Sequence, residues 1–283
     1  MSATLRLLLG VLLFLPLALS AQKKNRANQP AEMPQLPAVP LMPDAFPQVV
    51  GTQAFVPAYK FTKDDAVLEA AKGISAMGSR ILKINAVSGQ QLTPYIAMPF
   101  THYVLWYRSN DAWTKGLTPE LKRREYNAVY LFTKDLLTRY DATGKTFLLG
   151  HWEGDWYLLP DQDVKKDAAP EAVAAMIEWL NVRQKAVDDA RSEVPYSKCR
   201  VYTYAEVNRV RDAMKEGRKR AVNAVLPKVN VDFVSYSAYD CQLLPAEEVR
   251  QGRDFLTWLA DDHFTFLGYR EYQLETEEGA PEE

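Results

Sequence analysis

The spacing of apolar residues along this chain predicts strands that alternate with helices. Short apolar runs typical of buried strands lie near residues 49–57, 80–86, 103–107, 146–149, 199–207 and 231–236. Apolar positions three or four residues apart, typical of amphipathic helices, lie near residues 65–77, 118–140, 170–187 and 210–225. Alternation of this kind predicts a parallel sheet.

Six such strands, with polar or aromatic residues at the ends of the later ones, favour a TIM-type (β/α) barrel over a dinucleotide-binding sheet. The first strand is not followed by a G-x-G-x-x-G stretch. A closed barrel of this kind has eight strands, so we expect residues 48–240 to form an incomplete α/β barrel of six β-α units. Inward-pointing residues such as Phe147 and Leu149 would then be partly uncovered. Residues after 240 add a predicted helix, 245–260, and strand, 264–274.

The first 47 residues predict export. Arg6 precedes an apolar run, 7–19, and small residues at 18–21 suit cleavage, so residues 1–21 are expected to be a signal peptide. The apolar run is short for a membrane span, although an uncleaved anchor is the alternative. Residues 22–47 form a Pro-rich linker. We therefore expect a secreted or periplasmic protein with no membrane association after cleavage.

The charge of the chain limits the classes of partner that it is expected to bind. The formal net charge of −2 gives no reason to expect nucleic acid. A basic cluster at 215–220 is interpreted as a solvated helix face.

The two cysteines are not expected to form a disulfide. Cys199 and Cys241 fall at opposite ends of their predicted strands, too far apart for a disulfide, so two free thiols are expected.

The stretch that follows the fourth predicted strand holds the candidate chemistry. If the strand continues past Gly150, one face carries Phe147, Leu149, His151, Glu153 and Asp155. A carboxyl beside an indole and an imidazole suits a general acid, which assigns this role to Glu153. Trp152 and Trp156 offer flat faces to sugar rings, with His151 and Asp155 as further binding residues. The alternative is a satisfied polar cluster, with His151 in a tautomer fixed by hydrogen bonds.

The fifth and sixth predicted strands end in further candidates. Glu206 is the candidate second carboxylate that glycoside hydrolysis requires, or else a charge at a helix N-terminus. Asn208 and Tyr236 are candidate binding residues, and Asp240 is a binding residue or, as we favour, a helix cap. The histidines and carboxylates show no metal-ligand spacing, so we expect neither a metal nor a cofactor.

Residues 49–240 resemble secreted bacterial and fungal proteins described as glycoside-hydrolase-like TIM barrels. The resemblance is carried by residues 78–80, 151–156, 179–184, 206–208 and 234–240. It implies the barrel fold more firmly than a substrate. In related retaining glycosidases the acid/base Glu ends strand four, where Glu153 lies, and the nucleophile ends strand seven.

Residues 244–277 are similar instead to the N-terminal region of the large bacterial NAD-dependent glutamate dehydrogenases. The similarity is carried by residues 244–249 and 255–272 and includes none of that enzyme's catalytic or nucleotide-binding core. Because those enzymes are cytoplasmic, a join near Cys241 is expected, with residues 241–283 as a foreign tail that ends in an acidic, disordered segment.

Three hypotheses for function follow. The first is an exported glycoside-hydrolase-like protein that acts on or binds a carbohydrate, with Glu153 as general acid/base, inactive because it is truncated. The second is a non-catalytic carbohydrate-binding or structural barrel. The third, based on the tail alone, is a fragment of an NAD-dependent glutamate dehydrogenase.

Export gives a direct test. N-terminal sequencing of protein recovered outside the cytoplasm is expected to begin near Gln22, because the small residues at 18–21 suit signal cleavage. Recovery of the intact chain from the cytosol would contradict the prediction.

Overall fold

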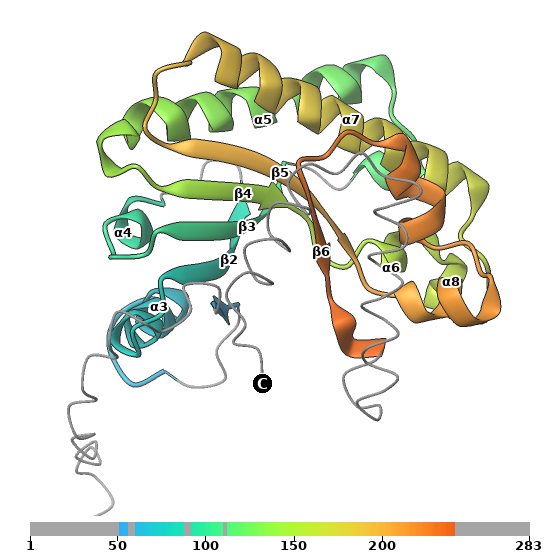
Figure 1. Ribbon diagram of the computed structural model, residues 1–283, viewed down its shortest axis with the longest axis horizontal. Coiled ribbons are helices and arrows are strands. Elements are labelled where there is room, and N and C mark those ends of the chain that lie inside the picture. Colours follow the sequence, from blue (N-terminus) through green and yellow to red (C-terminus); the bar gives the residue numbers. More distant parts are fainter. Residues whose placement is uncertain (1–50, 56–59, 88–91, 110–111, 241–283) are drawn as a thin grey trace, which may run out of the picture. The chain divides into compact units, whose positions relative to one another are not determined.

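The framework of the protein is a six-stranded sheet, seen in a computed structural model that describes residues 51–55, 60–87, 92–109 and 112–240 (Figure 1). Its strands are β1 (Thr52–Ala54), β2 (Ile81–Val87), β3 (His102–Arg108), β4 (Thr146–Gly150), β5 (Arg200–Val207) and β6 (Phe233–Tyr236). Neighbouring strands pair in parallel, in the order in which they occur along the chain. The predicted α/β class and parallel sheet are therefore confirmed.

Two long helices, α5 (Pro119–Arg139) and α7 (Pro170–Glu193), lie side by side over the β4 and β5 part of the sheet (Figure 1). Helix α5 begins where the sequence predicts, because Pro119 occupies its first turn and the Thr118 hydroxyl accepts a hydrogen bond from the Leu121 N–H at 3.2 Å. The shorter helices are α3 (Ala66–Ala76), α4 (Thr93–Ile96), α6 (Asp155–Leu158) and α8 (Val210–Glu216). Single turns of 3-10 helix lie at Ala112–Lys115, Asp141–Thr143, Pro160–Gln162, Leu226–Lys228 and Ala238–Asp240, and a π-helix at Ala221–Val225.

Burial alternates along the central strands, so the sheet has one core face. In β3, Tyr103, Leu105 and Tyr107 are buried, whereas Val104 and Trp106 between them are half-buried. Phe147 and Leu149 of β4 pair in register with this buried set. All five pack with apolar residues of α5 and α7 in a single core. Each buried side chain of this size contributes about 1.5–3 kcal/mol, so this face holds the helices on the sheet.

The prediction of a TIM-type barrel is wrong. Within the described residues, β1 pairs with β2 alone and β6 with β5 alone, so the curled sheet stays open like half of a barrel (Figure 1). Closure depends on strand number and stagger, which local periodicity does not encode. Phe147 and Leu149, expected to point into a barrel, face the helices instead and are completely covered.

The structure also corrects two local predictions. Strand β4 ends at Gly150, and residues 155–158 form α6, so the predicted alternation of faces does not continue to Asp155. The single helix predicted over residues 210–225 ends at Glu216, because Gly217 adopts a left-handed φ of 67° that closes α8.

Arg220 corrects the interpretation of the basic cluster as a solvated face. Its side chain is fully buried, its Nε donates to Asp212 at 3.1 Å, and its Nη2 donates to the Val164 carbonyl at 2.7 Å. Arg220 thus holds the segment after α8 against the β4–α7 connection.

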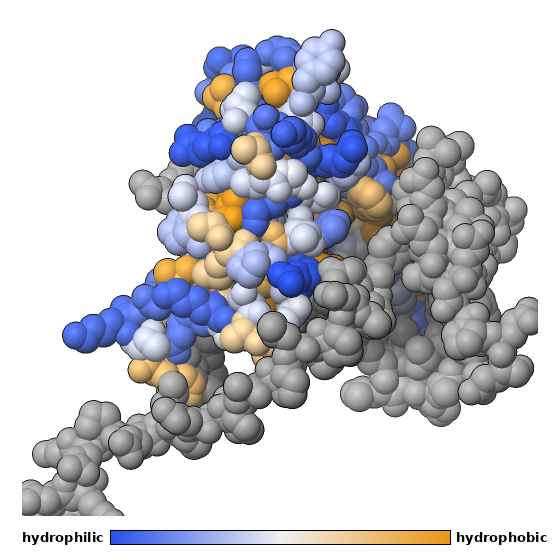
Figure 2. Space-filling view, turned by 60° about the vertical axis from the view of Figure 1, so that its left-hand side comes forward, coloured by the Kyte–Doolittle hydropathy of each residue, from blue (hydrophilic) through white to orange (hydrophobic). Residues whose placement is uncertain are grey.

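On the face shown in Figure 2, the described surface mixes hydrophilic residues with residues of intermediate hydropathy, and the hydrophobic residues are scattered. The exposed large apolar side chains come from separate segments of the chain: Phe61, Met77, Leu131, Trp152, Tyr196 and Tyr239. None of the described helices has the length and apolarity needed to cross a bilayer. Cys199 is buried with a free thiol, as predicted, whereas Cys241 lies outside the described residues.

A buried ion pair joins α5, α7 and the carboxyl ends of β3 and β4. Arg183 Nη1 donates to Glu125 at 2.8 Å, and both side chains are almost completely buried. Arg183 Nη2 also donates to the carbonyl oxygens of Tyr107, at 3.2 Å, and Gly150, at 3.5 Å. Charges removed from water need such partners, because an unpaired buried charge costs several kcal/mol.

Replacing Arg183 by Met is therefore expected to lower the free energy of unfolding by about 3–5 kcal/mol, because Glu125 stays buried without its counter-charge. Urea denaturation measures the loss. The double variant, which combines Arg183→Met with Glu125→Leu, should be destabilised less than the single variant Arg183→Met. Arg139→Met is the control, since its pair with Asp135 is exposed and is worth less than about 1 kcal/mol. Equal losses in the single and double variants would contradict the role of the ion pair.

Candidate functional site

The carboxyl ends of β4 and β5 meet in a tight cluster that two glycines make possible. The Gly154 N–H donates to the Glu206 carbonyl at 2.8 Å, and a β-carbon on Gly154 would lie 2.8 Å from that same oxygen. A β-carbon on Gly150 would lie 2.3 Å from the ring of Tyr204. Both contacts are closer than any real side chain permits, so the loop after β4 rests directly on β5.

Glu206 is completely buried at the centre of this cluster. Its Oε2 accepts hydrogen bonds from Lys83 Nζ, at 2.7 Å, and Trp106 Nε1, at 3.2 Å. Its Oε1 accepts from the Glu153 main-chain N–H, at 3.1 Å, and the Ser237 hydroxyl, at 2.9 Å. The structure thus brings Glu206 beside Glu153, with both Glu206 oxygens engaged by donors.

His151 is buried and held as a neutral imidazole. The Glu206 main-chain N–H donates to His151 Nε2 at 3.2 Å, so this nitrogen is the acceptor. Nδ1 lies 3.0 Å from the Trp152 carbonyl and therefore carries the proton. Burial lowers the pKa of His151 from 6.5 to about 4, despite the nearby Glu206 carboxylate. Both ring nitrogens have main-chain partners, which fits the predicted tautomer-fixed role.

The buried side chains of Asp155 and Asn208 link the segment that follows β4 to the segment that follows β5. The Asp155 carboxylate is fully buried and accepts from the main-chain N–H groups of Asn208, at 3.0 Å, Arg209, at 3.1 Å, and Ala221, at 2.7 Å. Asn208 Oδ1 accepts from the Asp155 N–H at 3.1 Å. Burial raises the pKa of Asp155, although these hydrogen bonds oppose the change. Both residues, predicted to bind substrate, occupy positions that hold the backbone together.

Glu153 is partly exposed at the edge of the cluster. Its Oε2 accepts from Trp156 Nε1, at 2.6 Å, and Asn208 Nδ2, at 3.2 Å. The Trp156 ring packs against the Arg209 guanidinium, with a separation of 5.9 Å. Trp156 therefore contacts protein groups on both its nitrogen and its ring.

Tyr236 and Asp240 lie beyond β5 and tie β6 to α8. The Tyr236 hydroxyl donates to Asp240 Oδ1 at 2.5 Å, and Asp240 Oδ2 accepts from the Arg211 N–H at 2.8 Å. Because Arg211 is in the first turn of α8, Asp240 satisfies a main-chain N–H at the start of that helix. The predicted helix that follows Asp240 lies outside the described residues, so its interpretation as a helix cap stays a prediction.

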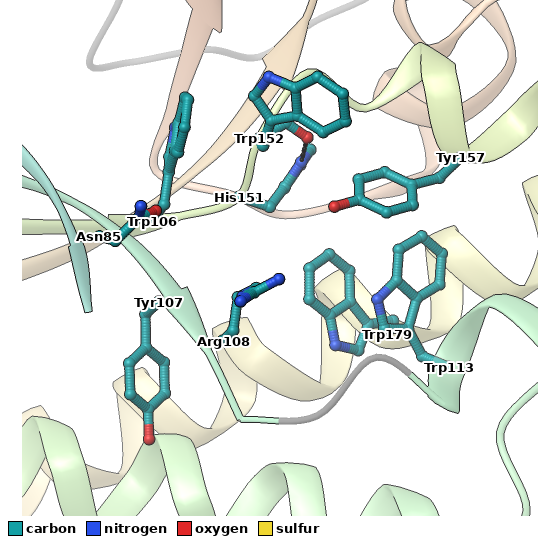
Figure 3. Close-up of a pocket in the computed structure, with 9 residues that line it drawn as sticks. All are labelled: Asn85, Trp106, Tyr107, Arg108, Trp113, His151, Trp152, Tyr157 and Trp179. Atoms are coloured by element: carbon teal, nitrogen blue, oxygen red, sulfur yellow. Dashed lines mark hydrogen bonds between the residues drawn. The ribbon is translucent and has the colours of Figure 1, made fainter. Parts of the chain in front are cut away.

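A pocket of about 240 Å³ opens beside the cluster (Figure 3). It is lined by Asn85, Trp106, Tyr107, Arg108, Trp113, His151, Trp152, Tyr157 and Trp179. Trp113 stacks on Trp179 with ring centroids 4.5 Å apart, and Tyr157 packs against Trp113 at 5.3 Å and edge-on against Trp152 at 6.1 Å. The Arg183 guanidinium, in turn, lies 4.6 Å from the Trp179 ring centroid.

Of the site residues predicted from sequence, His151 and Trp152 line the pocket, whereas Glu153 and Glu206 belong to the adjoining cluster. The other lining side chains were missed. Trp106 and Arg108 could have been predicted, since they lie at the carboxyl end of the predicted strand 103–107, and ligands bind at this edge of a parallel sheet. Among the described residues, no group of three or more His, Cys, Asp or Glu side chains could hold a metal ion.

Comparison with known proteins found a short similarity to an enzyme. Over an alignment of 88 positions, the chain is 36% identical to the NAD-specific glutamate dehydrogenase of Pseudomonas aeruginosa, and the match covers 26% of this chain and 5% of that enzyme. The match supports the predicted similarity to this class of enzyme. Residues 244–277, on which that prediction rests, lie outside the described part of the structure. This chain spans about 5% of that relative's length. No protein-family model matches the chain, and no solved structure does; the glycoside-hydrolase-like resemblance stays a prediction.

The buried neutral His151 predicts a loss of stability in acid. Its pKa is about 4 in the folded chain and about 6.5 in an unfolded chain, so below pH 6.5 the unfolded state binds the proton first. The contribution is complete above pH 6.5 and falls by about 3 kcal/mol as the pH drops to 4.

Urea denaturation at pH 7 and pH 4 measures this loss. In His151→Gln the corresponding part should disappear, whereas His102→Gln, at an exposed position, should keep most of it. An unchanged pH dependence in His151→Gln would show that the folded chain does not hold His151 neutral.

Proposed function

We propose that this protein is exported and binds a carbohydrate in the aromatic pocket at the carboxyl edge of its sheet. The observation that supports the proposal most is the set of aromatic walls formed by Trp113, Trp152, Tyr157 and Trp179 around one small cavity. The resemblance of residues 49–240 to glycoside-hydrolase-like proteins favours the same class of ligand. Residues 1–21, on which export depends, lie outside the described part of the chain.

The chemistry of the pocket suits a sugar ring. Flat indole and phenol rings pack against the C–H faces of a pyranose, while a few polar groups orient its hydroxyls. Asn85 and Arg108 offer polar groups at the wall, and the Tyr157 hydroxyl points inward (Figure 3). Trp152 keeps 38% of its surface exposed, so a ligand has apolar area left to cover.

The carboxylates favour binding over hydrolysis. Hydrolysis of a glycoside requires two carboxyl groups that reach the scissile bond from either side. Glu206 is fully buried, and each of its oxygens accepts two hydrogen bonds from the protein. Glu153 lies outside the lining of the pocket. We therefore assign Glu206 to the support of the loops and leave Glu153 as a partly exposed residue at the rim of the cluster.

The similarity to glutamate dehydrogenase does not change the proposal. It covers a small part of that enzyme, and no G-x-G-x-x-G stretch follows β1.

Replacing Trp152 by Ala is expected to weaken sugar binding about tenfold or more, which corresponds to about 1.4 kcal/mol. Isothermal titration of the full chain with a panel of neutral and acidic oligosaccharides gives the affinity. Tyr196→Ala is the matched control, because this aromatic side chain is 94% exposed and is not among the residues that line this pocket. Glu153→Gln should leave binding unchanged. Failure of the parent chain to bind any member of the panel would refute the proposal, as would equal affinity in Trp152→Ala.

A further inference from the structure

A groove of about 420 Å³ lies between the first half of α7 and residues 219–228, and its described lining residues all differ from those of the aromatic pocket. Helix α7 contributes Pro170, Val173, Ala174 and Ile177, whose spacing of i, i+3, i+4 and i+7 places them in one stripe along the helix. Ala174 is exposed, and Val173 and Ile177 are half-buried. Helix α7 thus carries a second apolar stripe in addition to the face that packs in the core.

The wall opposite this stripe is held in place at both of its ends. At one end, the Ala168 N–H donates to the Lys219 carbonyl at 3.1 Å, and the Lys219 N–H donates to Asp167 Oδ1 at 3.1 Å. At the other end, Asn181 Nδ2 donates to the Lys228 carbonyl at 3.1 Å. Because these bonds join the wall to residues before and within α7, the groove is formed before a ligand enters it, and binding costs less conformational entropy.

Two lysines of this wall supply the charge of the groove. The side chains of Lys219 and Lys228 are exposed, and neither ammonium group has an ion-pair or hydrogen-bond partner among the described residues. The described lining includes no Asp or Glu, and Glu171, in the first turn of α7, lies outside it. The groove therefore combines an apolar floor with two positive charges along one wall.

We propose that this groove binds an amphipathic helix of a partner protein, with acidic residues along the flank that faces Lys219 and Lys228. A helix of this kind lays its apolar face into a hydrophobic groove through side chains spaced three and four residues apart, which matches the spacing of the α7 stripe. Ala174 and Ala224 are small and leave room for larger side chains of the incoming helix. Opposite charges on the two surfaces fix the orientation of the helix and speed its association.

A synthetic peptide tests the proposal. The acidic probe is about 18 residues long, so that it can form a helix, with leucines three and four residues apart and glutamates along one flank. A basic probe has lysine in place of every glutamate. Fluorescence anisotropy of the dye-labelled probes, titrated with the full chain, gives both affinities. The parent chain should bind the acidic probe at least about tenfold more tightly than the basic probe at low salt, and added salt should reduce the difference.

Variants assign the binding to this groove. The double variant Lys219→Gln with Lys228→Gln should bring the affinities for the two probes within about threefold of each other. Ala174→Gln places a longer polar side chain in the stripe and should weaken binding of the acidic probe about tenfold or more. Lys185→Gln is the matched control, because this side chain is 68% exposed on the same helix and does not line the groove. Equal melting temperatures confirm that the variants fold.

Several outcomes would overturn the proposal. An undiminished preference for the acidic probe in the double lysine variant would remove both lysines from the site, and parental affinity in Ala174→Gln would place binding elsewhere. Self-association of the parent chain in sedimentation experiments, lost in Ala174→Gln and without binding of the acidic probe, would identify a second copy of the chain as the occupant. Binding of phosphatidylglycerol vesicles without binding of the acidic probe would identify a membrane surface instead.

Discussion

The buried carboxylate of Glu206 is the constraint on which the site depends. A charge removed from water must find a counter-charge and hydrogen-bond donors, or the fold loses several kcal/mol. The donors come from β2, through Lys83, from β3, through Trp106, and from two later segments, through the Glu153 main chain and Ser237. One acidic side chain therefore fixes the relative positions of four parts of the chain. The loop that carries Trp152 lies where it does because its backbone completes the coordination of this carboxylate.

The aromatic pocket lies beside this cluster and is supported by a second buried charge, that of Arg183. Arg183 packs against the Trp179 ring and bonds the carbonyl oxygens that end β3 and β4. Its partner Glu125 is supplied by α5. The same guanidinium thereby sets the spacing of two strand ends and supports one aromatic wall. In this arrangement, the rigidity that a binding site needs comes from ion pairs behind the pocket, and the pocket itself stays open to a ligand.

Local periodicity was enough to predict the parallel sheet and the start of α5. Carboxyl ends of adjacent parallel strands share an edge, so proximity of Glu153 and Glu206 follows from topology. The barrel prediction failed because closure is a property of the whole sheet. Trp113, Tyr157 and Trp179 were missed because they come from a connection, a short helix and a long helix, whose approach to one another depends on packing and leaves no spacing signal.

The ring of Tyr204 occupies the space that a side chain at position 150 would need, and Gly150 has no side chain to compete for it. The phenol ring stands where a β-carbon at 150 would be, with contacts of 2.3 Å. Any larger residue at 150 would require a smaller one at 204, so the two positions are expected to covary among relatives of this chain despite the distance between them in sequence. Such a paired exchange would mark the register of β4 against β5 in a set of aligned sequences, independently of any conserved chemistry in the pocket.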